Sequence, residues 1–412
     1  MIRCQGPRLW SRLMEMAKIG ATPDGGVCRL ALTDQDRAAR DLFVRWCKDL
    51  GGAVRVDQMG NIFARWPGQN PSLDPILLGS HLDSQPTGGK FDGTLGVLAG
   101  LEVVETLRDH QLLTTRPLEV VSWTNEEGAR FAPAMISSGV FAGVFTLEEA
   151  YASTDSSGLS LGQELERIGY LGSAAVGADR YHAAFELHIE QGPILEDAGS
   201  SIGVVTGVQG IRWYDLVIKG KETHAGPCPM PLRADPVHSL AQFLPEVYAL
   251  ANAYAPAARL TIGRIETTPG VRNTVAGEVR LSLDLRHPDA STLNQMDADL
   301  RKTITRLQSS SKTEASLHDI WYAPPVHFAP DCIEAVRQAA IQLQYTHQNI
   351  VSGAGHDAVY LARRIPTSMI FIPCKDGLSH NPLESCELEH IQAGANVLLG
   401  AVRYIDTHEV TT

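Results

Sequence analysis

Apolar runs and segments with helical periodicity alternate along the first half of the chain, which predicts an α/β fold. Thr33 opens a helix with a capping-box-like pattern, and Gly51-Gly52 closes it. Residues 53–66 predict a hairpin that turns near Met59-Gly60, and residues 93–110 have the period of a helix. This alternation is typical of a mixed sheet with helices on both faces.

A different pattern begins after residue 209. It predicts a strand at 211–219, a helix at 235–253, strands at 258–266 and 277–286, a helix at 289–308 and a strand at 316–322. This βαββαβ order is that of a ferredoxin-like unit. Helix and strand alternation resumes after Pro324-Pro325. We therefore expect a catalytic domain of residues 1–209 and 325–412, interrupted by an inserted domain of residues 210–324.

Composition places the chain among globular proteins. Its 412 residues are too many for one ordinary domain core, which predicts two domains. Of these residues, 44% are hydrophobic and 20% are charged. No apolar run approaches the roughly 20 residues that a membrane span needs. The seven cysteines, an odd number without paired spacing, argue against a disulfide framework and favour a cytoplasmic location. The net charge of -12 argues against nucleic acid or an anionic membrane as a partner.

Polar clusters follow apolar runs at several points. Two of these runs end in His81 with Asp83 and in Glu126-Glu127, and further clusters surround His188 and His380. Open α/β sheets bind their ligands at the carboxyl ends of their strands, so we expect these clusters to form one site. Imidazole and carboxylate are the groups that borderline-soft divalent ions prefer. The sequence therefore predicts a metallohydrolase.

Five side chains suffice to hold two divalent ions, namely His81, Asp92, Glu127, His188 and His380. Asp92 would bridge the ions, with two histidines on one ion and an acid and a histidine on the other. Asp83 lies two residues past His81 and is expected to accept the second N–H of that imidazole. Glu126 is not among these ligands and is the candidate general base. These ligands suit zinc, manganese, cobalt and nickel alike.

Long motifs also carry a family resemblance, at residues 79–101, 124–143, 186–192, 352–358 and 379–382. With them the chain resembles the M20-type metal-dependent amidohydrolases, from about Gly25 to its end. The branch it resembles contains N-carbamoyl-L-amino-acid hydrolases, β-ureidopropionases and allantoate amidohydrolases. The sequences of residues 85–93 and 131–135 resemble those of the carbamoylases more than those of the allantoate enzymes.

The resemblance implies a reaction. It is the metal-dependent hydrolysis of the carbamoyl C–N bond of N-carbamoyl-L-amino acids or N-carbamoyl-β-amino acids, which gives the amino acid, ammonia and carbon dioxide. Allantoate amidohydrolase, an enzyme of purine catabolism, is the main alternative. The inserted domain would then serve as a dimerisation and lid domain in a homodimer.

The resemblance also implies residue roles. His224 would reach the active site of the partner subunit and donate a hydrogen bond to the oxyanion. Asn273 would bind the ureido group, and Arg286 would hold the substrate carboxylate bidentately. Like His224, both are candidates to act in the site of the partner subunit. Gln191 and Gly355 match positions that contact substrate. Without the resemblance, His224 reads as a turn histidine and Arg286 as a solvated charge at a strand end.

The chain departs from the pattern of the family at a few positions, which are Cys228, Leu232, Ala234 and Ala276. Such changes could alter substrate preference or the dimer contact. Two rival hypotheses stay open at this point. One is a thiol amidase of the nitrilase type with Cys374 as nucleophile, and the other is a binding protein with a vestigial site.

Overall fold

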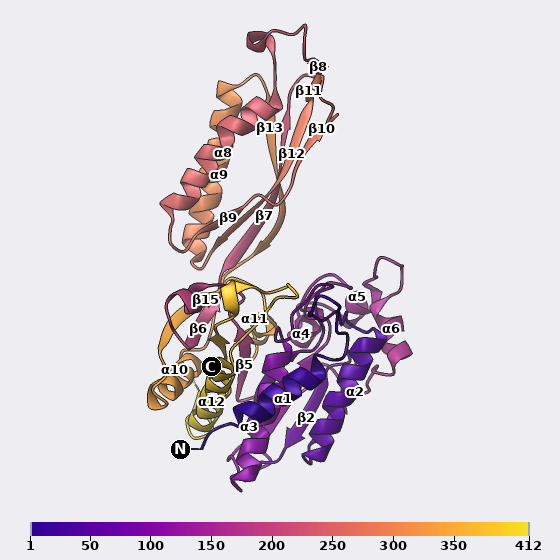
Figure 1. Ribbon diagram of the computed structural model, residues 1–412, viewed down its shortest axis with the longest axis vertical. Coiled ribbons are helices and arrows are strands. Elements are labelled where there is room, and N and C mark those ends of the chain that lie inside the picture. The colour runs from indigo at the N-terminus through magenta and orange to yellow at the C-terminus, as the bar shows by residue number, and fades with distance from the viewer. Residues whose placement is uncertain (1, 411–412) are drawn as a thin grey trace. The chain divides into compact units, whose positions relative to one another are not determined.

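The computed structural model describes residues 2–410, which divide into two compact units (Figure 1). The inserted unit is Gly207–Val326, and the larger unit combines the chain before and after it. The sequence predicts 210–324 for the inserted unit, so each boundary differs by two or three residues. The larger unit contains all the proposed metal ligands.

The larger unit is built around a mixed sheet. Its strands are β1 (Ala53–Val56), β2 (Ile62–Trp66), β3 (Ile76–His81), β4 (Leu118–Trp123), β5 (Ala183–Ile189), β6 (Ile202–Val208), β14 (Val326–His327), β15 (His347–Ser352) and β16 (Thr367–Ile372). They lie in the order β1-β2-β4-β3-β5-β16-β6-β14, with β15 beside β6. Strands β4, β3, β5 and β16 pair parallel to their neighbours, whereas β1 with β2, β2 with β4 and β16 with β6 pair antiparallel.

Helices cover both faces of this sheet. They are α1 (Gly6–Met16), α2 (Asp34–Asp49), α3 (Thr94–Asp109), α4 (Ile136–Phe141), α5 (Leu147–Ala152), α6 (Leu161–Ile168), α7 (Ile194–Asp197), α10 (Pro330–Gln342), α11 (Asp357–Leu361) and α12 (Leu388–Ile405), with a 3-10 turn η2 (Lys375–Gly377). Leu78 of β3 packs in the core with α1, α2, α3, α10 and α12, while the preceding Leu77 packs with residues of α4 and α11. Every residue of β3, β4, β5 and β16 is buried, as expected for parallel strands covered on both faces. Across residues 2–410, no helix is both long enough and apolar enough to cross a membrane.

Local signals account for the first elements. The Thr33 hydroxyl oxygen accepts the backbone N–H of Asp36 and caps α2, as the sequence predicts. The predicted hairpin is the antiparallel pair β1 and β2. Its turn is held by the Asp57 carboxylate, which accepts the backbone N–H groups of Met59 and Asn61 at 2.9 Å each. The helix predicted at 93–110 is α3.

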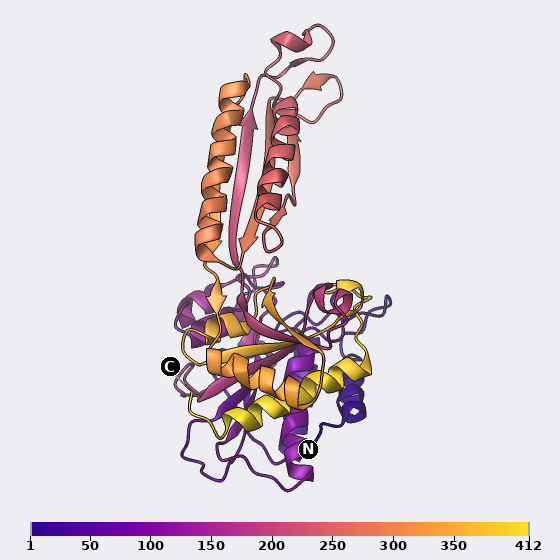
Figure 2. The same ribbon diagram turned by 90° about the vertical axis from the view of Figure 1, so that its left-hand side faces the viewer.

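The inserted unit has the predicted βαββαβ order. Its elements are β7 (Gly210–Lys219), β8 (Thr223–His224), η1 (Met230–Leu232), α8 (Pro236–Ala253), β9 (Arg259–Thr261), β10 (Ile265–Thr268), β11 (Thr274–Val275), β12 (Glu278–His287), α9 (Ala290–Ser310) and β13 (Glu314–Ala323). The sheet runs β10-β12-β7-β13, with β9 also beside β12. Helices α8 and α9 pack side by side on one face, which Figure 2 shows clearly. Alternate residues of β12 point to these helices and form the core with them.

The strand predicted at 258–266 is broken in the structure. From Thr261 to Ile265 the chain advances four residues, while its partner β12 advances only three, from Asp284 to Leu281. One extra residue therefore lies between β9 and β10, which is the signature of a β-bulge. Alternation alone does not reveal such an insertion, because the apolar pattern continues on both sides of it.

Candidate active site

Parallel strands deliver the candidate ligands to one edge of the larger sheet. His81 is the last residue of β3, Glu126 and Glu127 follow β4, and His188 lies near the end of β5. His380 lies on the loop after β16. Because β4, β3, β5 and β16 are adjacent and parallel, their carboxyl ends meet at the same edge. The topology thus brings together side chains from positions 81 to 380.

The five predicted ligands form two groups that share Asp92. The ligand atoms of His81, Asp92 and His188 lie within 4.8 Å of one another, and so do those of Asp92, Glu127 and His380. Asp92 Oδ1 lies 3.5 Å from His81 Nε2 and 3.2 Å from His188 Nε2. Its other oxygen, Oδ2, lies 3.6 Å from His380 Nε2, which is itself 3.3 Å from Glu127 Oε2. Each oxygen of Asp92 therefore faces one group.

Hydrogen bonds to backbone carbonyls fix the tautomers of the two buried histidines. His81 Nδ1 lies 2.9 Å from the carbonyl oxygen of Asp83, and His188 Nδ1 lies 2.9 Å from that of Ile189. A carbonyl can only accept, so both Nδ1 atoms carry a proton, which leaves each Nε2 as the atom that would offer a lone pair to an ion. The backbone N–H of Gly93 lies 3.1 Å from His188 Nε2, and an ion there would take over this lone pair. Neutral imidazoles and carboxylates at these spacings fit divalent ions.

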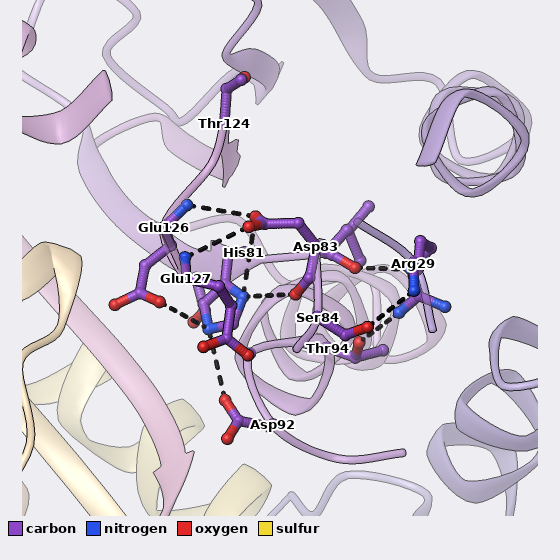
Figure 3. Close-up of polar contacts among 12 residues, drawn as sticks. Arg29, His81, Asp83, Ser84, Asp92, Thr94, Thr124, Glu126 and Glu127 are labelled. Carbon is purple, nitrogen blue, oxygen red and sulfur yellow. Dashed lines mark hydrogen bonds and ion pairs between the residues drawn. The ribbon is translucent and has the colours of Figure 1, made fainter. Parts of the chain in front are cut away.

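Asp83 contacts the site in a different way from the predicted one. Its carboxylate lies 3.9 Å from His81 Nδ1, too far for a hydrogen bond, and its backbone carbonyl takes the imidazole proton instead. Figure 3 shows the carboxylate turned to the backbone nitrogens of Glu126 and Glu127, each 3.2 Å from one of its oxygens. Asp83 therefore holds the segment that carries the candidate base and one candidate ligand.

Asp92 and Glu126 have pKa values that the site pushes in opposite directions. Burial disfavours the ionised form of Asp92, but attraction to His188 and His81 is stronger and holds the pKa of Asp92 well below its usual range. Burial, together with repulsion from neighbouring acids, raises the pKa of Glu126 well above its usual range against the opposing effect of His81. Glu126 Oε2 lies 3.5 Å from His81 Nε2, beside both ligand groups but a member of neither. The low pKa of Asp92 suits a ligand that stays charged, and the raised pKa of Glu126 suits a group that exchanges a proton.

Gly93 makes the approach of Asp92 to His81 possible. Its φ is +64°, and a Cβ there would lie 2.3 Å from Cε1 of His81. The residue directly follows Asp92 and precedes α3. Only glycine satisfies both the left-handed backbone and the contact with the imidazole.

The loop of residues 379–384 also contacts Asp92, which the sequence did not reveal. The Ser379 hydroxyl donates to Asp92 Oδ2 at 2.6 Å, and Glu384 Oε1 accepts the backbone N–H groups of Phe91 at 2.8 Å and Asp92 at 3.2 Å. Glu384 lies two residues beyond the recognised motif, and an acid after Asn-Pro-Leu reads as a solvated loop residue. Only its buried position distinguishes it.

Further polar residues support the ligands. Gln85 donates to both Glu127 oxygens, from its backbone at 3.1 Å and from its side chain at 2.8 Å. Glu186 and His356 form another close group with His188, but both already have partners, the Ser80 hydroxyl at 2.6 Å and the Ser352 hydroxyl at 3.0 Å. They therefore form a layer behind the ligands.

The predicted substrate residues of the larger unit lie at or behind this edge. The amide nitrogen of Gln191 donates to Asp92 Oδ2 at 2.8 Å. Within the described chain, its amide oxygen is buried without a hydrogen-bond partner, so it can accept from a ligand. Gly355 packs against Met135, whose Cε would lie 2.8 Å from an added Cβ.

The three predicted residues of the inserted unit separate into two places. His224 pairs with Thr274 across β8 and β11, and the backbone N–H of Ala225 donates to the Asn273 carbonyl at 2.9 Å. His224 and Asn273 are therefore close neighbours. Arg286 lies at the other end of β12, where it forms an ion pair with Asp284 at 2.7 Å.

Cys374 is not suited to act as a nucleophile. The seven cysteines are free within the described chain, and Cys374 is fully buried. Burial raises the pKa of its thiol to about 12, so the reactive thiolate is scarce at neutral pH. The thiol hypothesis would also leave the two groups that share Asp92 without a role.

Comparison with known proteins identifies the family of the chain. Residues 77–404 match the peptidase family M20/M25/M40. The N-carbamoyl-L-amino-acid amidohydrolase of Rhizobium meliloti is 47% identical over 408 residues, which cover 99% of this chain and 98% of the relative. The allantoate amidohydrolase of Bacillus subtilis is 33% identical, with 93% of each chain covered. A crystal structure of an amidase of the hydantoinase/carbamoylase family from Burkholderia multivorans is 54% identical, with a TM-score of 0.97 over 99% of this chain and 100% of that one. The chain therefore belongs to the peptidase family M20/M25/M40.

Proposed function

We propose that the chain hydrolyses the carbamoyl C–N bond of N-carbamoyl-L-amino acids, or of N-carbamoyl-β-amino acids, to the amino acid, ammonia and carbon dioxide. The observation that carries this proposal is the shared position of Asp92 between two ligand groups, with Glu126 beside them. The relative from Rhizobium meliloti supports the substrate class, because nearly the whole of both chains aligns.

The two groups would hold two divalent ions per subunit, zinc or alternatively manganese, cobalt or nickel. Such ions supply Lewis acidity and make water a better nucleophile near neutral pH. Glu126 accepts the proton of the attacking water and later returns it to the leaving nitrogen. Its backbone is fixed on two sides, because its N–H donates to Asp83 and its carbonyl accepts the N–H of Met135 at 2.6 Å. The base is therefore oriented before the substrate arrives.

The substrate carboxylate needs a cation, because the chain carries a net charge of -12. Arg286 is the proposed partner. Asp284 contacts Arg286 Nε at 2.9 Å and Nη2 at 2.7 Å, which fixes the plane of the guanidinium. Arginine can bind a carboxylate through two parallel N–H···O bonds, which suits it to this role.

The inserted unit supports a dimer in which one site uses residues of two chains. From Glu278 to Arg286 strand β12 advances eight residues, or about 27 Å at about 3.4 Å per residue. His224 and Asn273 lie beyond the Glu278 end, since β8 follows β7 and β11 precedes β12. One small substrate cannot contact both Arg286 and His224 of the same chain. We therefore infer that a site that uses both Arg286 and His224 takes them from two copies of the chain, and, following the family resemblance, we assign His224 and Asn273 to the site of the second copy.

The proposal is tested by ammonia release from a panel of N-carbamoyl-L-amino acids, N-carbamoyl-β-alanine and allantoate. The metal-loaded protein is assayed with and without chelator, and Glu126→Gln serves as a control that retains all five proposed ligands. We expect turnover of a carbamoyl amino acid that chelation and Glu126→Gln both abolish. Turnover of allantoate alone would overturn the substrate class, and chelator-resistant turnover would overturn the role of the ions.

A further inference from the structure

One loop carries a proposed metal ligand and two groups that hold another ligand in place. His380 lies on this loop between Ser379 and Glu384. The Ser379 hydroxyl donates to Asp92 Oδ2 at 2.6 Å, and Glu384 binds the backbone N–H groups of Phe91 and Asp92. Ser379 and Asp92 are 287 positions apart in the sequence, so no local turn produces this contact.

The contact places the two oxygens of Asp92 in different surroundings. Oδ1 faces His81 and His188, whereas Oδ2 faces His380 and accepts from Ser379 and Gln191. A carboxylate oxygen has two lone pairs, so an ion on Oδ2 leaves room for one donor. Ser379 has the shorter bond to Oδ2, and its hydroxyl also lies 3.4 Å from Glu384 Oε2. We therefore take Ser379 as the donor that would remain on Oδ2 beside an ion.

Glu384 is placed for this role by close packing. It is buried, and a Cβ added at Gly89 would lie only 2.0 Å from its carboxyl carbon. The loop that leads to Asp92 thus approaches the Glu384 carboxylate directly. Loss of that carboxylate leaves two buried N–H groups without their acceptor beside the bridging ligand.

We propose that Ser379 and Glu384 are positioning residues: Ser379 fixes the rotation of the Asp92 carboxylate, and Glu384 fixes the backbone that carries it. The ion at Asp92, Glu127 and His380 would then depend on Ser379 more than the ion at His81, Asp92 and His188. This inference rests on the proposed function, because it assumes that the two groups hold ions. It assigns to the loop a second task besides the supply of His380.

The test measures metal binding directly. Apoprotein is titrated with Co²⁺ and followed by visible absorption, and Zn²⁺ binding is measured by equilibrium dialysis. Ser379→Ala is expected to weaken the ion at Glu127 and His380 by about 10- to 100-fold, the usual effect of losing a partner of a metal ligand. The other ion is expected to change far less. Ser368→Ala, which removes a buried hydroxyl bonded to the Val205 carbonyl at 3.2 Å, is the matched control and should change neither ion.

Glu384→Ala and Glu384→Gln separate geometry from charge. The glutamine retains an acceptor for the two N–H groups, so it should restore most of the affinity that the alanine loses. If Glu384→Ala does not fold, the metal titration of Ser379→Ala is sufficient to test the inference. Equal weakening of both ions by Ser379→Ala, no weakening, or a Glu384→Gln variant as weak as Glu384→Ala would overturn the inference alone. A wild-type chain that binds fewer than two ions would overturn the proposed function as well.

Discussion

The carboxylate of Asp83 holds Glu127 by its backbone, with one oxygen 3.2 Å from the Glu127 nitrogen. The other oxygen holds the nitrogen of Glu126 in the same way. A single buried acid thus fixes two successive residues with different proposed tasks, a base and a metal ligand. The imidazole of His81 depends on the Asp83 carbonyl, which any residue at this position provides.

Asp83→Asn tests this arrangement. The amide offers one acceptor oxygen and one NH₂ group, so one of the two backbone N–H groups loses its partner at a cost of about 1–3 kcal/mol. We expect kcat/KM to fall by about 10- to 100-fold, with the ion at Glu127 and His380 weakened more than the ion at His81. Metal titration and steady-state kinetics check this result. A selective loss of the ion at His81 would instead show that the carboxylate acts through the imidazole.

Gly93→Ala is expected to remove the metal centre. The new Cβ would meet the His81 ring at 2.3 Å, so the imidazole or the Asp92 segment must move. Metal content and activity should both be lost. The matched control is Gly143→Ala, since Gly143 also has a positive φ but no atom within 4 Å of an added Cβ. The control should cost about 1–2 kcal/mol of stability from the backbone alone and retain its ions. A Gly93→Ala chain with both ions bound would refute the packing argument.

Mixed dimers test whether His224 acts in the active site of the other chain. His224→Ala and Glu126→Gln chains are expected to be inactive alone. A dimer of one chain of each kind has one site with an intact Glu126 and an intact His224 from the other chain. Random co-assembly should therefore restore about a quarter of wild-type activity, because half of such symmetric dimers are mixed and each has one complete site. Activity is measured after co-expression, with the double variant as control. No recovery in dimers shown to be mixed would mean that His224 acts within its own chain.

The candidate ligands could be identified from the sequence because their chemistry lies in residue type and their location follows from apolar runs. Strand ends are recognisable when a buried parallel strand stops at a polar cluster, as at His81 and before Glu126. Family motifs then added His224, Asn273 and Arg286, whose roles no periodicity indicates. The order of elements in the inserted unit could also be predicted from the sequence, but the extra residue between β9 and β10 could not.

What the sequence determined by itself is the set of side chains that can meet at one edge of the sheet, and the α/β fold that brings them there. Tertiary structure alone decided which atom of each residue makes each contact. Asp83 meets His81 through its carbonyl because of the path of the backbone after β3, and Glu384 meets Asp92 across 292 positions because β16 lies beside β5. Apolar periodicity reports which face of an element is buried, whereas hydrogen bonds depend on the relative placement of segments far apart in the chain.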